Sequence, residues 1–329
     1  MKERNCTFDI MKGIAMVLVI LSHTLPFEMT RPFAPFRSTL FFVVSGYFAK
    51  EWLFKDFLIH GSKRLLIPYL FTCVLMFPLV LLGEYLFDYQ TLLIALKSMT
   101  LGSSSFEGTL FDINIGPLWF ICALLWVRIF WSLMRPLKND YVKGAIILLL
   151  AISALKLKNI VVLPWSLQPA FGALGFFFAG HIFRKYDVLN HLKGNFIPII
   201  CMTSLFYGVM LGFTDINRGV YGGLYIIDVF ESLGAFLLMY VVIDKIADKR
   251  SKIWCFLDFF GRYSLVAFCI HAIDQCLNVH WFPLKLWSFF ATDFELFCAV
   301  ILRVGFAAFG CYLISKNNFL KEKIFFIKD

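Results

Sequence analysis

Charged residues are scarce in this sequence. Asp, Glu, Lys and Arg make up 16% of its 329 residues, against about 25% in an average soluble domain. Hydrophobic residues make up 60%, and 40 residues are Phe. A soluble chain of this length cannot bury so much apolar surface in one core. The composition therefore excludes an ordinary soluble enzyme and predicts an all-α, polytopic integral membrane protein.

Other features that the sequence lacks further limit the kinds of site and domain that the protein can contain. None of the nine Cys lies in a CxxC pair, and most occur in apolar stretches, so we expect neither disulfides nor a metal site. No stretch is long and polar enough for a soluble domain, and no repeat is evident. We expect one transmembrane domain over 1–329. We interpret the Lys and Arg residues that give the net charge of +9 as topology anchors near anionic lipid, and not as a nucleic-acid binding patch.

Ten apolar runs approach the length of about 20 residues that a membrane-spanning helix needs. They lie near 8–27, 36–50, 65–87, 115–134, 143–157, 167–184, 196–213, 222–243, 254–277 and 293–315. With the N-terminus in the cytoplasm, most of the 31 Lys and Arg fall on the inner side. This bias follows the positive-inside rule. It predicts a multi-pass protein of the cytoplasmic membrane, with about ten spans and both termini cytoplasmic.

The first apolar run, FDIMKGIAMVLVILSHT, carries Asp9, Lys12 and His23. At about 100° and 1.5 Å per helical residue, all three share one face, and His23 lies about 16 Å beyond Lys12. Ionisable groups in a span cost about 2.5–3.5 kcal/mol each at its centre, so we expect this stripe to face the bundle interior. The competing interpretation is that Asp9 and Lys12 are interfacial and that His23 only packs helices.

Further polar residues in the spans divide by predicted depth. The inner side is mainly basic and holds Lys63, Arg64, Arg128, His181, Asp258 and Arg262. The outer side holds Trp119, Asp228, Glu231, His271 and Asp274. A basic inner pocket suits an anionic ligand with phosphates, and a histidine with carboxylates suits proton transfer. For any single charged group, a structural ion pair is the competing interpretation.

Five landmarks follow one another along the chain. The Asp9–Lys12–His23 pattern comes first, then LFFVVSGYF with Ser45 and Tyr47, and then KRLLIPY, GPLWF and GRYSLVAFCIH. In this order they resemble the membrane acyltransferase-3 family, which includes sugar and polysaccharide O-acetylases, and most closely its fucose 4-O-acetylase-like members. Two departures from the family pattern are expected. Lys12 replaces the Arg more often seen in the polysaccharide O-acetylases, and we expect a stand-alone version without an appended extracytoplasmic domain.

The resemblance implies acetyl-CoA as a donor substrate from the cytoplasm and a hydroxyl acceptor on a sugar or polysaccharide. Imidazole suits deprotonation of that hydroxyl. The implied catalytic residues are His23, Asp9, His271, Glu231 and Asp274, and the sequence does not choose which carboxylate orients the histidine. The implied donor-binding residues are Lys12, Arg64, Lys63, Arg262 and Arg128. The implied acceptor-binding residues are Ser45, Trp119 and Tyr47. Direct transfer and an acetyl-histidine intermediate are both open.

Other classes fit less well. A multi-span transporter of an anionic or sugar-linked substrate also has buried charges and interrupted spans, such as those at Pro78 and Pro198. No correspondence between the two halves supports it. In the membrane-bound O-acyltransferase class the key histidine comes late, as His271 does, but the Asp9–Lys12–His23 stripe would then lack a role. The expected partners are the acceptor and membrane lipids, without nucleic acid, and a homo-oligomer is left open.

Overall fold

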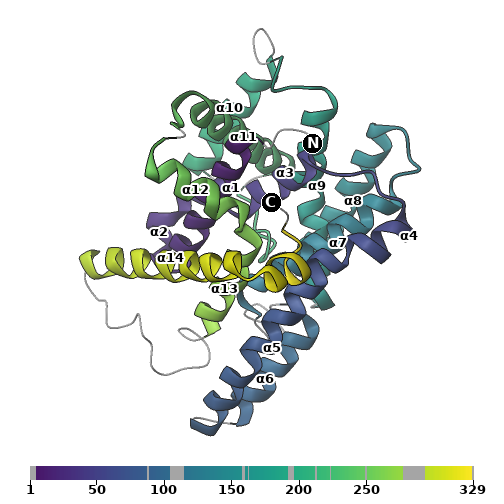
Figure 1. Cartoon of the computed structure of the whole chain (residues 1–329). Coiled ribbons are helices and arrows are strands. Elements are labelled where there is room, and N and C mark those ends of the chain that lie inside the picture. Colours follow the sequence, from purple (N-terminus) through teal and green to yellow (C-terminus); the bar gives the residue numbers. More distant parts are fainter. Residues whose placement is uncertain are drawn as a thin grey trace. The chain divides into compact units, whose positions relative to one another are not determined.

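The computed structural model shows a chain built of helices (Figure 1). It describes residues 5–86, 89–103, 115–157, 160–161, 163–191, 196–211, 213–222, 224–248, 250–276 and 293–327. Within these ranges the only β pairing is an isolated antiparallel bridge between Asp215 and Val220. The all-helical prediction is thus confirmed for the described part of the chain.

The chain divides into two compact units. Unit 1 comprises Met1–Glu51, Met134–Leu155 and Phe171–Ser264. Unit 2 comprises Trp52–Leu133, Lys156–Ala170 and Leu265–Asp329. That 1–329 acts as one transmembrane domain stays a prediction.

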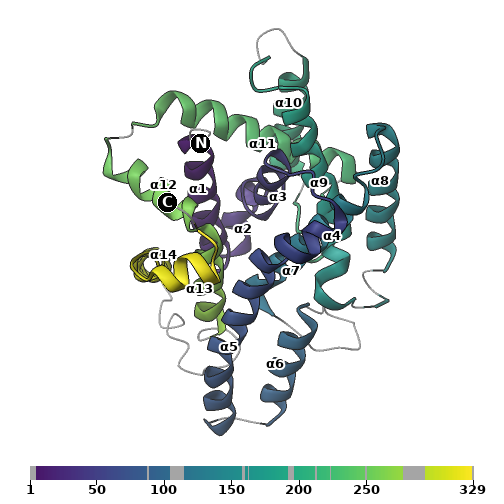
Figure 2. The same cartoon turned by 45° about the vertical axis from the view of Figure 1, so that its right-hand side comes forward.

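Unit 1 is built around the first helix of the chain. Its elements are α1 (Cys6–Ser22), α2 (Phe27–Thr30), η1 (Arg31–Phe36), α3 (Ser38–Tyr47), α8 (Asp140–Leu157), α9 (Leu167–Lys185), α10 (Phe196–Leu211), α11 (Tyr225–Ile246) and α12 (Lys252–Arg262). The Asn5 side chain caps α1 by accepting a hydrogen bond from the Thr7 amide over 3.0 Å. Helix α1 packs against α12, and α10 packs against α11 (Figures 1 and 2).

Two glycines allow α1 and α12 to approach closely. A Cβ at Gly261 would overlap the backbone carbonyl of Asp9, and a Cβ at Gly13 would overlap the carbonyl of Leu257. Small residues of this kind let helix backbones come together where lipid supplies no hydrophobic drive for association. The crossing therefore fixes the two helices next to Asp9.

Unit 2 contains the remaining elements. They are α4 (Phe54–Asp56), η2 (Phe57–Gly61), α5 (Lys63–Leu86), α6 (Tyr89–Leu101), η3 (Gly116–Leu118), α7 (Trp119–Leu133), η4 (Pro164–Ser166), α13 (Ser264–Gln275), α14 (Asp293–Lys316) and η6 (Leu320–Ile324). Helices α5 and α6 run side by side (Figure 2), and the Tyr69 hydroxyl of α5 donates to the Met99 carbonyl of α6 over 2.5 Å. The segment after α14 returns to α5, where the rings of Phe71 and Phe325 lie 6.0 Å apart.

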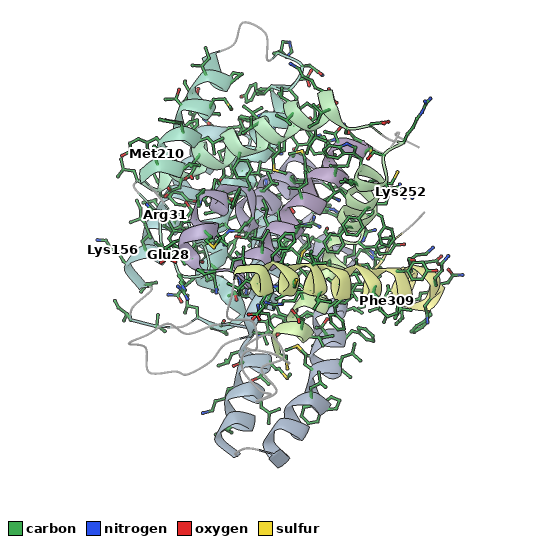
Figure 3. All side chains as sticks on the ribbon, turned by 90° about the vertical axis from the view of Figure 1, so that its left-hand side faces the viewer. Glu28, Arg31, Lys156, Met210, Lys252 and Phe309 are labelled. Carbon is green, nitrogen blue, oxygen red and sulfur yellow. The ribbon has the colours of Figure 1, made fainter. Side chains whose placement is uncertain are left out.

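Among the residues that the structure describes, four helical stretches are long and apolar enough to cross a membrane. They are Phe54–Leu79, Gly116–Leu133, Tyr225–Ile246 and Glu295–Lys316. A fifth results if α12 and α13 are counted as one broken span. Exposed apolar side chains such as Met210 and Phe309 (Figure 3) suit contact with lipid tails. The apolar helices agree with a membrane protein, whereas the count of ten spans and the cytoplasmic termini stay predictions.

Three of the predicted apolar runs differ in length or continuity from the helices that the structure shows in the same regions. The run 8–27 ends as a helix at Ser22, because the amides of His23 and Thr24 donate to carbonyls only three residues earlier, at Ile20 and Leu21. The run 36–50 yields α3, whose 10 residues extend only about 15 Å. The run 254–277 is broken at Tyr263 into α12 and α13. This run therefore consists of two helices bent by 81° against each other, which can still form one broken span.

Candidate active site

Two ion pairs lie on the crossing helices of unit 1. Lys12 Nζ of α1 is 2.7 Å from Asp9 Oδ1. One guanidinium nitrogen of Arg262 in α12 is 2.8 Å from Asp258 Oδ2. The contact between Gly261 and the Asp9 carbonyl places Arg262, the next residue, at the same crossing. The structure thus brings together two predicted donor-binding residues, Lys12 and Arg262, with the predicted catalytic residue Asp9.

The cations at this crossing retain hydrogen-bonding capacity. The Asp9 side chain is only 6% exposed, whereas that of Lys12 is 25% and that of Arg262 is 45% exposed. An ammonium has three N–H donors and a guanidinium has five, so each can hold its carboxylate and donate to a second anion. The arrangement can therefore bind phosphate oxygens without breaking either ion pair.

His23 lies just beyond the other end of α1. It is the C-cap residue, its side chain is exposed, and its Nδ1 is 3.0 Å from the Val19 carbonyl oxygen. A carbonyl can only accept a hydrogen bond, so Nδ1 carries the proton and Nε2 carries the lone pair. This is the tautomer in which Nε2 acts as a base. Along the predicted stripe, the side chain of Asp9 is therefore buried, that of Lys12 is partly exposed, and His23 is exposed.

The predicted acceptor-binding residues Ser45 and Tyr47 lie near the C-terminal end of α3. The Tyr47 ring is 4.9 Å from that of Phe8, which precedes Asp9, and 5.8 Å from that of Phe236 on α11. Tyr47 is therefore placed at the end of α1 that carries Lys12, and not at the end that carries His23. Its backbone carbonyl accepts a hydrogen bond from Arg184 of α9 over 3.1 Å.

Glu231 is buried on α11 against α10. A Cβ at Gly208 of α10 would overlap the Glu231 carboxylate, so this glycine leaves room for it. Asp228 lies one turn earlier on the same face and is also buried. The predicted orienting carboxylate thus has a carboxylate neighbour in unit 1. In the sequence analysis, Asp228 lies on the same predicted side as Glu231 but has no assigned role.

Unit 2 holds a second buried constellation, formed by His271, Asp274 and Arg303. His271 Nδ1 on α13 is 3.5 Å from Asp274 Oδ2. Arg303 of α14 reaches the same oxygen with Nε and with one terminal nitrogen, each at 2.6 Å. All three side chains are nearly inaccessible. The sequence predicts His271 and Asp274 on the same side and leaves Asp274 as one candidate to orient His23, but it does not pair Asp274 with His271. It also assigns no role to Arg303, whose only signal was a positive charge inside an apolar run.

The other predicted site residues of unit 2 are more accessible. Lys63 and Arg64 begin α5 and are exposed, and Arg128 of α7 is half-buried. Trp119 begins α7, with its ring 6.1 Å from that of Phe120. The predicted donor-binding cations are therefore divided between the units, with Lys12 and Arg262 in unit 1 and the other three in unit 2. Among the described residues, no three His, Cys, Asp or Glu gather to hold a metal ion.

Comparisons with known proteins match most of the chain. The family model described as "Acyltransferase domain" matches residues 7–316. The nodulation protein NolL of Sinorhizobium fredii is 26% identical over 237 residues, which cover 67% of this chain and 59% of that protein. The NolL of Mesorhizobium japonicum is 24% identical over 225 residues, covering 61% and 55%.

The chain thus aligns with less than two thirds of the length of these relatives. No solved structure matches it. The family model, however, extends from the second residue of α1 to the last residue of α14 and includes both clusters of ionisable residues. By this match, the chain belongs to the acyltransferase-3 family.

Proposed function

We propose that the protein is an O-acetyltransferase of the cytoplasmic membrane. It transfers the acetyl group of cytoplasmic acetyl-CoA to a hydroxyl of a cell-envelope sugar or polysaccharide. The observation that carries the proposal is the hydrogen bond between His23 Nδ1 and the Val19 carbonyl, because it leaves Nε2 as the basic nitrogen on an exposed side chain. Membership of the acyltransferase-3 family supports the reaction class.

In direct transfer, His23 Nε2 removes the proton from the acceptor hydroxyl as its oxygen attacks the thioester carbonyl. The C–O bond forms, the C–S bond breaks, and the imidazolium returns the proton to the departing CoA thiolate. In the alternative, Nε2 itself attacks the carbonyl and an acetyl-histidine passes the acetyl group on. Both routes consume one thioester and one hydroxyl and yield one ester and one thiol.

The donor is held by its phosphates in this proposal. Lys12 and Arg262 lie at the α1–α12 crossing with side chains that are partly exposed. Arg64 and Lys63 are exposed at the start of α5. Cationic N–H groups form charge-assisted hydrogen bonds with phosphate oxygens, which are roughly twice as strong as neutral ones. The ion pairs keep Lys12 and Arg262 oriented before the donor binds.

The test is transfer by the purified protein in lipid nanodiscs, with labelled acetyl-CoA and a panel of methyl glycosides that includes a fucoside. We expect label in a glycoside ester, formed in equal amount with free CoA. Release of CoA without any labelled ester, from every glycoside and from an extract of envelope glycans, would contradict the proposed acceptor class. Acetyl label on His23, found when turnover is stopped rapidly at neutral pH, would select the acetyl-histidine route.

A second candidate for the base is His271. Its Nδ1 lies 3.5 Å from Oδ2 of the Asp274 carboxylate, and a carboxylate in this position orients the histidine in many acyl-transfer sites. His271 is buried, whereas His23 is exposed. Since an acceptor must reach the base, we assign the proton transfer to His23 and keep His271 as the alternative base.

A further inference from the structure

Two consecutive residues of unit 2 have a left-handed backbone although neither is glycine. Trp165 has φ 58° and ψ 33°, and Ser166 has φ 55°. A bulky side chain is rare in this region because its Cβ approaches the following carbonyl. Such conformations persist only where the surroundings hold them, and they cluster at ligand clamps and active sites. The strain at Trp165 therefore needs a cause.

Three hydrogen bonds hold the strained turn in place. The Ser166 amide donates to Ser103 Oγ over 2.8 Å, and Ser166 Oγ donates to the Gly102 carbonyl over 2.7 Å. Ser103 Oγ in turn donates to the Leu163 carbonyl over 2.8 Å. Residues 102–103 and 163–166 are distant in sequence, so these bonds clamp two separate segments together. The backbone of Trp165 is thus fixed from both sides.

The ring of Trp165 is also fixed. Its centroid lies 5.8 Å from that of Tyr69 at an interplanar angle of 37°. The Tyr69 hydroxyl is anchored on the Met99 carbonyl, so Tyr69 is a rigid support. Trp165 is half-buried, whereas its neighbour Ser166 is buried. Trp165 as a residue therefore keeps some accessible surface, while the clamp and Tyr69 fix its backbone and its ring.

We propose that Trp165 binds the acceptor by packing its indole against the C–H face of a saccharide ring, which rests on the proposed function. An indole offers a large, rigid apolar face and one N–H donor, which suits a ring with apolar faces and a hydroxyl rim. The segment 163–166 also lies on the predicted outer side, where an envelope glycan would arrive. Ser103 and Ser166 are positioning residues that act through Trp165.

The central test replaces Trp165 with Asn, which tolerates the left-handed region and lacks the ring. With the methyl glycoside that the wild-type protein acetylates, we expect the acceptor KM to rise by about tenfold or more, as loss of a well-packed aromatic contact does. The affinity for acetyl-CoA should stay within about twofold, because no phosphate contact is lost. Trp126→Tyr, on α7 of the same unit, is the control and should leave both values unchanged.

The positioning role of Ser166 can be distinguished from a purely structural role by combining two substitutions. Ser166→Ala should raise the acceptor KM in the wild-type background but not in the Trp165→Asn background, because the hydroxyl acts only through the indole. A purely structural Ser166 would lower stability equally in both backgrounds and leave KM alone. If Trp165→Asn does not fold, Trp165→Phe tests the same contact with a smaller ring and should raise KM by about threefold.

The outcomes separate the two proposals. A wild-type protein that acetylates no glycoside would remove the proposed function. A wild-type protein that acetylates a glycoside, with an unchanged acceptor KM in folded Trp165→Asn or Trp165→Phe, would overturn the role of Trp165 and leave the proposed function intact. Higher thermal stability of Trp165→Asn together with an unchanged KM would show that the strain serves no acceptor.

Discussion

Gly261 of α12 lies directly against the backbone carbonyl of Asp9 in α1. Asp9 is the residue whose side chain pairs with Lys12, and Gly261 is followed by Arg262, whose guanidinium pairs with Asp258. One close helix crossing therefore sets the position of two cations that we assign to donor binding. Packing and function are coupled at this point, because any change that separates the helices also separates Lys12 from Arg262.

Gly261→Ala should lower the stability of the protein and weaken donor binding. The added methyl group has backbone atoms, not a flexible side chain, in its way. Overpacking of this kind costs about 1–3 kcal/mol. Thermal unfolding in detergent and acetyl-CoA binding are the two measurements. Gly305→Ala on α14 is the matched control, since a Cβ there meets nothing within 4 Å. It should be neutral or stabilising by up to about 1 kcal/mol. Equal behaviour of the two variants would contradict the close crossing.

The buried pair of Asp274 and Arg303 predicts a large effect of single substitutions. Arg303→Met leaves a buried carboxylate without its ion pair, which costs about 3–5 kcal/mol. Replacing both partners, as in Asp274→Leu with Arg303→Met, should recover most of that stability because no isolated charge remains. Thermal unfolding of both single variants and the double variant measures the coupling. Additive losses in the double variant would show that the two side chains do not depend on each other.

The sequence was sufficient for features that depend on near neighbours. The spacing of Asp9 and Lys12 correctly indicated that they share one face of a helix, where they form an ion pair. Apolar runs gave α5, α7, α9 and α14 to within a few residues. Periodicity alone did not show that the first helix ends before His23, since the apolar pattern continues while the hydrogen bonds change to the i→i−3 type at His23 and Thr24.

Contacts between distant segments were beyond sequence reasoning. Arg303 meets Asp274 across two helices, and no local pattern links an Arg in an apolar run to a particular carboxylate. The left-handed backbone of Trp165 was likewise missed, because its cause lies in hydrogen bonds to Gly102 and Ser103 and not in its own residue type. Both features require tertiary packing, which a single sequence does not specify by pattern.

The ion pair between Lys185 and Asp140 predicts a defined dependence on pH. Lys185 Nζ lies 2.5 Å from Asp140 Oδ2. This hydrogen bond lowers the pKa of Asp140 and raises the pKa of Lys185. The contribution of Asp140 to stability is therefore present above its unfolded pKa of about 3.9 and is lost as pH falls through the lower folded value. That of Lys185 is present below about pH 10.4 and is lost as pH rises through the higher folded value.

Between these limits the pair should stabilise the protein by a constant amount. Because the Lys185 side chain is 42% exposed, that amount is on the order of 0.2–1 kcal/mol and should shrink in high salt. The measurement is the difference in thermal unfolding between wild type and Lys185→Ala at pH 7, at pH 3 and in 1 M salt. A difference that grows as the pH falls to 3 would have the wrong sign for this pair.

The role of each predicted donor-binding cation can be tested separately. Arg64→Ala and Lys12→Gln should each weaken acetyl-CoA binding by about 1.5–3 kcal/mol, the scale for a hydrogen bond to a charged group. Lys97→Ala is the control, since this exposed lysine of α6 lies on the predicted outer side. Titration calorimetry in nanodiscs gives the affinities. Unchanged affinity would remove the tested residue from the donor site, and a loss in Lys97→Ala would indicate a non-specific electrostatic effect.

His23→Ala is expected to abolish transfer while the protein stays folded and inserted. Loss of a general base lowers the rate by about 10²–10⁴, and acetyl-CoA binding should remain nearly intact because His23 lies beyond the opposite end of α1 from Lys12. His191 supplies a close control. Its Nδ1 is 3.0 Å from the Asp187 carbonyl, four residues earlier, just as His23 Nδ1 is 3.0 Å from the Val19 carbonyl. His191→Ala therefore removes the same local hydrogen bond from an exposed histidine.

Comparison of His23→Ala with His191→Ala shows whether His23 acts in proton transfer or only in local packing. If His23 only closes the end of α1, both substitutions should cost the same small amount of stability, about 0.5–1.5 kcal/mol for one hydrogen bond, and both proteins should remain active. If His23 is the base, only His23→Ala loses kcat, with the KM for acetyl-CoA nearly unchanged. Should His23→Ala acetylate at the rate of His191→Ala while His271→Ala is inactive, the base would be His271, and the proton transfer would belong to unit 2.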